Sequence, residues 1–466
     1  MRRPPACAGI LAASGPARSF DLKAFESAHL QLVRLRAQVN PPEDVDKWRD
    51  AGATAFVLQL LSPLPAQQPT TPRAFVEAFA DDVAAFAAHG VHDLEIHDEP
   101  NRADRGAGIS WQDGGTFAAW FLEVKQLLRE RLGEAVAVGF PALAFSGQAR
   151  PEPAAPMDEA AFLKGCKAAL AEADWAALHL YWATRDEMRG HGDTMRFLRA
   201  YLEPFATQTF IVTEFANVTP GLAADARGAQ YVEFLTLLAQ YDRIAGSCAF
   251  LLHSDAPRYA PLAWLEPDGS PRPVVSAVGN RPKLPDPLRL QMTWPTEFRR
   301  YDQYFGENQK AYYDGCGMTG GHNGVDLRVD CASPETSPIQ AALEGTVIQV
   351  SFDAKGYGHH LRVRSYGPEG EEITLIYAHL SAVAVTVGTL VRRGDVLGMA
   401  GSTGAGAGPH LHLGMRVQGI QMRAVFDWLN PRPYLDAAAR GLPREPDAAA
   451  YVLLPPDALR STLAAF

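Results

Sequence analysis

The chain has 466 residues, of which 47% are hydrophobic and 21% are charged, and its formal net charge is −10. This length exceeds one small core and predicts two domains, or a large domain and a small one. The composition is ordinary for a globular protein, and the negative charge argues against a nucleic-acid partner bound through its phosphates. No apolar run reaches about 18 residues, so we expect no membrane-spanning helix.

The N-terminus begins with Met1-Arg2-Arg3 and continues with the short apolar stretch Ala6–Ala13, a pattern similar to a very short signal peptide. The apolar part is marginal in length and contains Gly9, so we expect it to form a first strand instead. An incomplete or misassigned start is the alternative. The sequence therefore offers no convincing export signal, and localisation stays open at this point.

Apolar, strand-like runs alternate with amphipathic helical stretches through residues 1–280, as in an α/β fold with parallel strands. The eight strand candidates are Ala8–Ala12, Leu32–Gln38, Ala55–Leu60, Asp93–His97, Ala135–Phe140, Ala176–Trp182, Thr209–Glu214 and Gly246–Leu252. Helical spacing of apolar residues marks stretches between them, such as Pro72–His89, Gly115–Leu132, Asp158–Ala173 and Gln230–Tyr241. Eight such pairs predict a (β/α)8 TIM barrel. A doubly wound open sheet is the alternative, which the missing glycine-rich phosphate loop disfavours.

Two carboxylates stand where predicted strands end. Glu99 follows the fourth strand in Asp98-Glu99-Pro100, and Glu214 ends the seventh. Catalytic residues of such barrels lie at the C-terminal ends of the strands. Two opposed carboxylates about 5 Å apart perform retaining glycoside hydrolysis, one as acid/base and one as nucleophile. The simpler interpretation makes Glu99 the start of a loop and Glu214 a solvated turn residue.

This arrangement resembles clan A glycoside hydrolases, in which the acid/base follows the fourth strand and the nucleophile follows the seventh. The resemblance implies Glu99 as acid/base and Glu214 as nucleophile. His179-Leu180-Tyr181 matches the His-x-Tyr of the clan. We therefore expect the substrate site to include Arg36, His179 and Tyr181, with Tyr181 near Glu214 and Arg36 keeping Glu214 ionised through a charge-assisted hydrogen bond. Asp98 replaces the usual Asn, which favours the alternative that the barrel only binds glycan.

The segment Glu266–Leu290 contains six prolines, namely Pro267, Pro271, Pro273, Pro282, Pro285 and Pro287. Proline at this density disfavours helix and sheet interiors and predicts a semi-rigid linker. We place the barrel domain at residues 1–284, with the linker beginning near 266. A smaller domain then spans 285–436, followed by an alanine-rich tail at 437–466.

Five residues of the smaller domain combine metal ligands with acid/base groups: His322, Asp326, His379, His410 and His412. His322 and Asp326 are four residues apart in a glycine-flanked segment. His410 and His412 alternate on a predicted strand, so their side chains share one face. Three protein ligands with one open position are the arrangement of a catalytic zinc rather than of a structural one.

These motifs resemble those of the LytM/lysostaphin-type metallopeptidases: His-x-x-x-Asp at His322–Asp326, Tyr-x-His-Leu around His379, and His-Leu-His at His410–His412. The resemblance covers about residues 292–436 and predicts a mainly-β domain. It implies that His322, Asp326 and His412 bind Zn²⁺, while His379 and His410 serve catalysis. Gly414 stands where family members often carry Glu.

Together the two halves suggest a zinc endopeptidase of bacterial peptidoglycan joined to a glycoside hydrolase-like barrel that cleaves or binds the glycan. Peptidoglycan, or a related polymer of sugar and peptide, is the expected partner, and we expect action at the cell envelope or outside the cell. Two alternatives stay open. The barrel is a non-catalytic glycan-binding module, or the whole chain is a non-catalytic scaffold or activator of other wall hydrolases.

Overall fold

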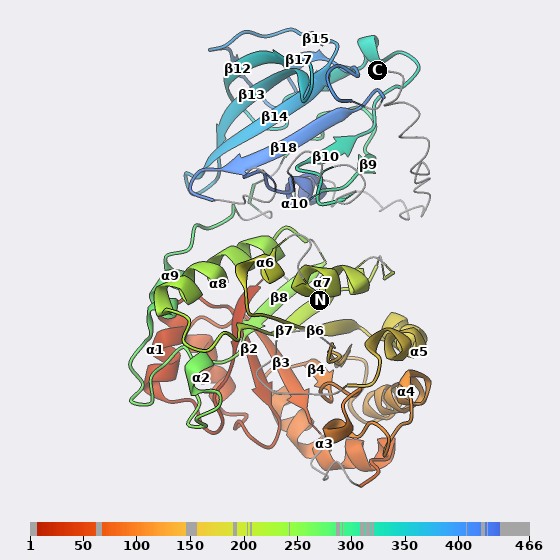
Figure 1. The fold of residues 1–466 in the computed structure, drawn as a ribbon, viewed down its shortest axis with the longest axis vertical. Helices are drawn as coiled ribbons and strands as arrows, with labels where there is room; N and C mark the ends of the chain where they lie inside the picture. The colour runs from red at the N-terminus through yellow and green to blue at the C-terminus, as the bar shows by residue number, and fades with distance from the viewer. Residues whose placement is uncertain are drawn as a thin grey trace. The chain divides into compact units, whose positions relative to one another are not determined.

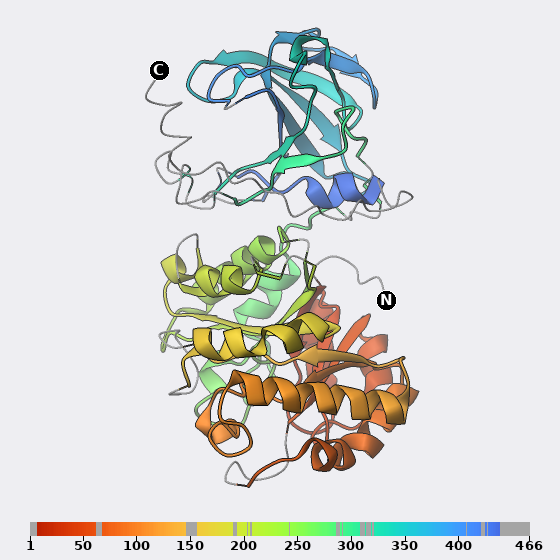
Figure 2. The same cartoon turned by 90° about the vertical axis from the view of Figure 1, so that its right-hand side faces the viewer.

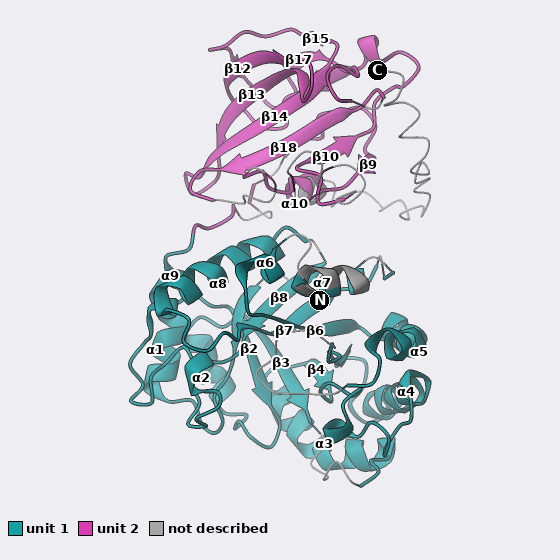
Figure 3. Ribbon diagram, viewed as in Figure 1, with its two compact units in different colours: residues 1–281 teal, residues 282–466 magenta. Residues whose placement is uncertain are grey.

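The computed structural model describes residues 7–61, 68–145, 156–189, 193–202, 204–205, 207–241, 243–285, 289–290, 292–307, 321–406, 408–420 and 427–438, and the single positions 313, 318 and 425. The chain divides into two compact units, residues 1–281 and 282–466 (Figure 3). The predicted boundary at 284/285 lies three residues further along. Each unit is described separately below. Within the described residues, no helix combines the length and apolarity needed to cross a membrane.

The first unit is a closed barrel of eight parallel strands in chain order (Figures 1 and 2). Its strands are β1 (Cys7–Leu11), β2 (Leu32–Arg36), β3 (Ala55–Leu60), β4 (Asp93–Ile96), β5 (Ala137–Phe140), β6 (Trp175–Trp182), β7 (Phe210–Asn217) and β8 (Ile244–Ala249). The predicted (β/α)8 barrel is confirmed. Closure through the β1–β8 pair rules out the open doubly wound sheet.

Helices surround the strands: α1 (Ser19–Ser27), α2 (Asp44–Asp50), α3 (Pro72–Ala88), α4 (Gly114–Leu132), α5 (Glu159–Glu172), α6 (Arg185–Met188), α7 (Asp193–Leu202), α8 (Ala224–Leu238) and α9 (Pro273–Gly279), with the short 3₁₀ turns η1 (Ala103–Arg105) and η2 (Ala260–Leu262). Their starts follow local chemistry. Thr71 caps α3 by accepting a hydrogen bond from Ala74, and Asp113 caps α4 through Thr116.

The inside of the barrel changes from apolar to polar along the strands. A buried apolar cluster includes Leu32 at the start of β2 and Trp175 at the start of β6. Arg34 follows two residues after Leu32 and points to the same side of β2. It is fully buried and meets Glu95 from β4. The apolar layer therefore closes one end of the barrel, and polar groups gather toward the C-terminal ends of the strands.

We expected the linker to begin near residue 266, and this start is wrong. Residues up to 281 belong to the barrel unit, and α9 forms inside the proline-rich segment. Pro273 stands at the first helical position, where its missing N–H costs no hydrogen bond. Val274, Val275 and Val278 are then buried in the barrel core. Proline therefore begins a helix here.

The second unit is built on a seven-stranded antiparallel sheet in the order β16-β12-β13-β14-β18-β10-β9, with a three-stranded sheet β11-β17-β15 beside it in the fold (Figure 1). The strands are β9 (Tyr301–Gln303), β10 (Val325–Leu327), β11 (Pro338–Gln340), β12 (Gly345–Asp353), β13 (Gly358–Tyr366), β14 (Glu372–Leu380), β15 (Ala382–Val383), β16 (Leu390–Val391), β17 (Val396–Met399) and β18 (Leu411–Val417), with η4 (Pro334–Thr336) and α10 (Arg432–Ala438). The predicted mainly-β domain is confirmed. Of the predicted tail, residues from 439 onward lie outside the described residues.

Candidate functional site

The second unit brings His322, Asp326 and His412 together. Asp326 on β10 and His412 on β18 are direct partners in an antiparallel pair, and His322 lies just before β10. His322 Nε2 lies 2.9 Å from His412 Nδ1 and 3.2 Å from Asp326 Oδ1, and the third side of the triangle measures 3.1 Å. All three residues are buried. Their donor atoms form a nearly regular triangle that could hold a metal ion.

This donor set fits zinc. Two imidazole nitrogens and one carboxylate oxygen are common zinc ligands, and tetrahedral bonds of about 2.0–2.1 Å separate neighbouring ligand atoms by about 3.3–3.4 Å. The observed separations of 2.9–3.2 Å are close to that spacing. His322 Nδ1 is held by Tyr304 O at 3.1 Å, which leaves Nε2 as the ligand atom.

His379 and His410 lie next to this triangle. Their rings are 4.8 Å apart between centroids, and His410 Nε2 is 3.7 Å from Asp326 Oδ1. Each ring donates its Nδ1–H to a backbone carbonyl, His379 to Thr403 at 2.8 Å and His410 to Gly408 at 2.7 Å. Both rings therefore present Nε2 as the atom that can accept a proton.

The surroundings favour the metal-binding forms of two ligands, His412 and Asp326. Burial lowers the pKa of His412, and burial together with the nearby His410 lowers the pKa of His379 to about 3. Burial opposes the charge of Asp326, but His322 and His410 outweigh it and hold the pKa of Asp326 well below its usual value. Neutral imidazoles beside an ionised carboxylate are the forms that bind a metal.

Tyr357 and Trp428 complete the surroundings and carry no motif of their own. The Tyr357 ring lies 5.5 Å from that of His412, and its hydroxyl accepts a hydrogen bond of 2.7 Å from Asn323. Packing explains why position 414 is a glycine where the family often has Glu. A Cβ at this position would lie 2.9 Å from Ile376 Cγ2 and 3.0 Å from Trp428 Cε3, so these two side chains occupy the space that a larger residue would take.

In the barrel unit, Arg34 contacts two of the buried carboxylates. Its Nε lies 2.7 Å from Glu95 Oε2, and its Nη1 lies 2.6 Å from Glu214 Oε1. Tyr181 on β6 donates its hydroxyl hydrogen bond to Glu214 Oε2, as expected. A register shift between β6 and β7 places His179 opposite Glu214 and leaves Thr213 as an extra residue. This bulge lets both Thr213, which bonds Glu95, and Glu214 reach the same interior.

The predicted contact of Arg36 with Glu214 is wrong. Arg36 Nη2 donates its hydrogen bond to Ser14 Oγ at 2.6 Å, and Arg34 makes the contact with Glu214. Both arginines stand on the same side of β2, and Arg34 is nearer the barrel interior. Arg34, two residues before the predicted Arg36, therefore forms the charge-assisted hydrogen bond with Glu214.

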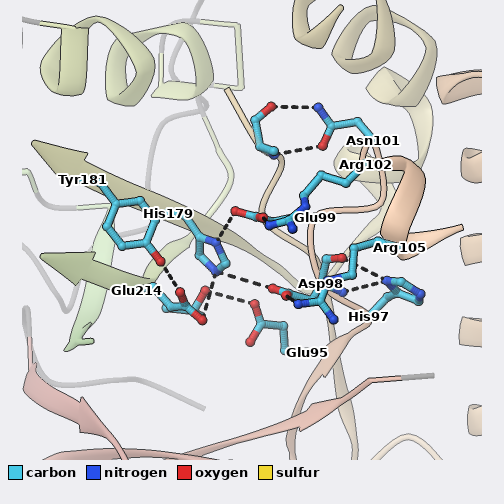
Figure 4. Close-up of polar contacts among 12 residues, drawn as sticks. Glu95, His97, Asp98, Glu99, Asn101, Arg102, Arg105, His179, Tyr181 and Glu214 are labelled. Atoms are coloured by element: carbon cyan, nitrogen blue, oxygen red, sulfur yellow. Dashed lines mark hydrogen bonds and ion pairs between the residues drawn. The ribbon is translucent and has the colours of Figure 1, made fainter. Parts of the chain in front are cut away.

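The segment after β4 presents two adjacent carboxylates to His179. Glu99 Oε1 lies 2.9 Å from His179 Nδ1, while Asp98 Oδ1 lies 3.8 Å from His179 Nε2 (Figure 4). Glu214 Oε1 is also 3.8 Å from this second nitrogen. His97 and Glu99 have positive φ angles of 71° and 42°, which cost energy in residues other than glycine. The kinked backbone thus turns Asp98 and Glu99 to opposite nitrogens of one imidazole.

Charges in this cluster shift one another. Burial opposes ionisation of Glu214, but His179 and Arg34 outweigh it and lower the pKa of this carboxyl. Burial raises the pKa of Asp98. Burial also opposes the charge of His179, yet Glu214 and Glu99 raise its pKa to about 9. These shifts favour the ionised form of Glu214 and oppose the ionisation of Asp98.

Comparisons with known proteins match the second unit. The model of Peptidase family M23 matches residues 320–424. The chain is 37% identical over 117 residues to DD-carboxypeptidase/endopeptidase Mpg of Neisseria meningitidis serogroup B, which is 25% of this chain and 25% of that protein. It is 31% identical over 126 residues to Peptidoglycan DD-endopeptidase ShyC of Vibrio cholerae, 27% of each protein. The chain thus spans only about a quarter of the length of these relatives.

A solved structure matches the barrel region. It is an endo-β-1,3-glucanase of family GH128 from Sorangium cellulosum, with 20% identity and a TM-score of 0.43, covering 60% of this chain and 99% of that one. The motifs around His322, His379 and His412 lie inside the matched range of the family model. The resemblance to LytM/lysostaphin-type peptidases is thereby confirmed. Residues 320–424 form a domain of Peptidase family M23, C-terminal to a closed eight-stranded parallel barrel.

Proposed function

We propose that the second unit is a zinc-dependent endopeptidase that hydrolyses peptide bonds of bacterial peptidoglycan. The observation that carries this proposal is the triangle of donor atoms from His322, Asp326 and His412, with sides of 2.9–3.2 Å, next to two further histidines. The relatives named as endopeptidases support the substrate class. Action at the cell envelope or outside the cell follows from that substrate.

His322 Nε2, His412 Nδ1 and Asp326 Oδ1 would hold the zinc ion. Zinc, when bound, supplies Lewis acidity to the scissile carbonyl and to the attacking water. His410 presents Nε2 toward this site because its Nδ1–H is fixed on Gly408 O. It would accept the proton of the attacking water.

His379 presents Nε2 in the same way, since its Nδ1–H is fixed on Thr403 O. Its lowered pKa keeps it neutral, with that nitrogen available. Because the proton of the neutral ring is on Nδ1, His379 Nε2 would accept a hydrogen bond from the attacking water and help to orient it. Both side chains act from rigid backbone contacts, which fixes the direction of the proton transfer.

We further propose that the barrel acts on the glycan of the same polymer by retaining glycoside hydrolysis. Glu214 supports this function, because Arg34 and Tyr181 bind its two oxygens and keep it an ionised nucleophile. The proton donor would come from the segment after β4, which carries Asp98 and Glu99. His179 and Tyr181 would position the sugar. Arg36 would line the edge of the site beside Ser14, at one remove from Glu214.

Digestion of purified peptidoglycan tests both activities in one experiment. Peptide cleavage creates free amino groups, and glycan cleavage creates reducing ends. His410→Ala should abolish the new amino groups, whereas Glu214→Gln should abolish only the new reducing ends. His359→Ala is the matched control, because this exposed histidine of β13 lies outside the five-residue set.

Each alternative has its own outcome. Unchanged amino-group release in His410→Ala would overturn the peptidase assignment. Glycan that binds to the wild-type barrel but is never cut would establish a binding module. A wild-type chain that cuts neither bond would leave only the scaffold or activator.

A further inference from the structure

We propose that the peptidase site continues into a subsite that binds a carboxylate of the peptide substrate, and that Arg362 is the residue that binds it. The inference rests on the proposed peptidase function and names one chemical feature of the substrate, an acidic group near the bond that is cut. Three observations carry it: the sheet face that Arg362 shares with His412, the convergence of two arginines on Trp428, and a buried donor atom of Arg362.

The sheet face that carries the zinc ligand His412 continues past the triangle of donor atoms. His412, Gly414 and Arg416 alternate along β18, so they point to one face of the sheet. Gly414 lies opposite Ile376 of β14, which in turn lies opposite Arg362 of β13 (Figure 1). Residues directly opposite each other in neighbouring strands share a face. Arg362 and Arg416 therefore point to the same side of the sheet as His412.

Arg362 is close enough to the zinc site for one peptide to reach both. It lies two strands and two residues away from His412, so the spacings of a β-sheet place their Cα atoms about 12 Å apart. An extended peptide covers this distance in about three to four residues. Tyr357 contacts both regions, because its ring centroid lies 5.5 Å from that of His412 and 6.3 Å from that of Trp428.

Two arginines converge on the indole of Trp428. Arg416 Cζ lies 4.2 Å from the ring centroid, and Arg362 Cζ lies 5.5 Å from it. The indole is buried, whereas both arginines are half-buried. Stacking on an aromatic face leaves the N–H donors of a guanidinium in its own plane, where they can bind a carboxylate bidentately. The ring thus holds two cations at one place on the sheet face.

Arg362 has a buried donor atom that the fold leaves unsatisfied. Its Nε has no hydrogen-bond partner among the described residues. Burial lowers the pKa of Arg416, and the charge of Arg362 lowers it further, while Tyr357 and Asp427 oppose this. Two like charges in partly buried surroundings repel each other. A carboxylate bound by Arg362 would relieve this repulsion and accept a hydrogen bond from the buried Nε.

The surface beside Arg362 supplies no anion of its own. Gly414 has no side chain, and the apolar atoms of Ile376 and Trp428 fill its place. The proposed substrate supplies the anion instead, because a peptide carries carboxylates on acidic side chains and at its end. A planar carboxylate matches the fork of the guanidinium donors. An acidic peptide is therefore the substrate class that fits this face.

Amidation of the substrate tests the subsite without altering the protein. The zinc-loaded full chain is incubated with cross-linked peptide fragments of purified peptidoglycan, and with the same fragments after their carboxyl groups are converted to amides. The acids should be cut with a kcat/KM about 10–100-fold higher, the usual effect of a hydrogen bond to a charged group. The difference should lie in KM, because the carboxylate is bound before and during the reaction. Fragments amidated only at the side chain, or only at the end, identify which carboxylate binds.

Binding gives a second readout that does not depend on cleavage. The full chain stripped of zinc is titrated with the acids and with the amides in a calorimeter. The acids should bind about 10–100-fold more tightly, for the same reason.

Variants assign the effect to Arg362. Arg362→Gln should lose the preference for the acids and keep the wild-type kcat/KM for the amides. Arg362→Lys keeps the charge without the planar fork, so it should retain part of the preference. Arg393→Gln is the matched control, because it removes the same charge from an exposed residue between β16 and β17. The comparison of acids with amides in the wild-type chain decides the matter even where a variant does not fold.

The results that would overturn the inference differ from those that would overturn the peptidase function. Equal cleavage and equal binding of acids and amides by the wild-type chain would reject the subsite and leave the peptidase function standing. An equal loss for both substrates in Arg362→Gln would show a structural role only, and would also reject it. Tighter binding of the acids without cleavage of either substrate would overturn the peptidase function and leave the carboxylate site standing.

Discussion

Arg34 Nη1 donates a hydrogen bond of 2.6 Å to Glu214 Oε1, although the two residues are 180 positions apart in the chain. The same guanidinium binds Glu95 at 2.7 Å, and its side chain is fully buried. One cation thus contacts carboxyl groups from both β4 and β7. The C-terminal end of the barrel strands is held together by this charge pairing as well as by apolar packing.

Replacing Arg34 should therefore destabilise the barrel strongly. Arg34→Met leaves Glu95 and Glu214 buried without their partner, and breaking a buried pair in this way costs about 3–5 kcal/mol. Arg36→Met is the matched control on the same strand and should cost much less, because the Arg36 side chain donates a hydrogen bond to the neutral hydroxyl of Ser14. Denaturant unfolding of the full chain, followed by hydrogen exchange in the barrel strands, measures both. Equal losses for the two variants would contradict the central role of Arg34.

Arg36 was predicted to bind Glu214, but Arg34 makes this contact. The difference illustrates what the sequence could predict. Alternating apolar runs and helical spacing located all eight barrel strands, because burial on both faces leaves a strong local pattern. The pattern says which residues lie on β2 but not how far along the barrel axis each side chain reaches. The bulge at Thr213, which turns Glu214 inward, depends on the register between β6 and β7 and leaves no local signal.

The second unit was more predictable at its site than the barrel. His322, Asp326 and His412 come together because β10 and β18 pair in register, and their motifs were visible as short spaced sets. Trp428 was not predictable as the residue that fills the space at Gly414, since the two are brought together only by the fold. The proline-rich segment misled for a related reason. Proline at the start of α9 and proline in a linker look alike in sequence.

The stability of the barrel should fall as the pH rises from about 6.5 toward 9. The pKa of His179 is raised from 6.5 to about 9 in the folded chain, since Glu214 and Glu99 outweigh the cost of burying its charge. The folded state thus binds a proton that the unfolded state releases between these values. This contribution is complete below pH 6.5 and is lost as the pH passes about 9.

Thermal unfolding measured across that range tests the prediction, with His179→Gln as the comparison. The variant should be less stable than the wild type at pH 6, and the difference should shrink by pH 10. A constant difference at every pH would show that the proton on His179 contributes nothing to stability.

The amount of zinc that the chain binds should depend on His322, Asp326 and His412. The wild-type chain, stripped with a chelator and refilled, should bind about one zinc ion. Asp326→Asn and His412→Ala each remove one corner of the triangle and should reduce bound zinc below half of the wild-type content. His410→Ala should keep the metal while losing peptidase activity, because its Nε2 lies 3.7 Å from Asp326 and outside the triangle. Elemental analysis measures all of these, and loss of zinc from His410→Ala would make that residue a ligand.

Gly324 should support zinc binding although it carries no ligand atom. A Cβ at this position would lie 2.6 Å from His412 Cε1 and 2.6 Å from the backbone oxygen of Leu413. These contacts are shorter than atoms tolerate, and the backbone cannot move aside without breaking the pairing of Asp326 with His412. Gly324→Ala should thus displace the His412 ring and weaken zinc binding by about 10–100-fold, as loss of a supporting residue does.

Gly367→Ala is the control for this change, because a Cβ there meets only the flexible side chain of Glu371. Zinc affinity measured by competition with a coloured chelator should fall in the first variant and stay unchanged in the second. Both variants should retain the far-ultraviolet circular dichroism of the wild type. A Gly324→Ala chain that folds and binds zinc with wild-type affinity would contradict this prediction. It would mean that the His412 ring can move away from the added Cβ and still bind zinc, so the proposed positions of the ligand atoms would have to be revised.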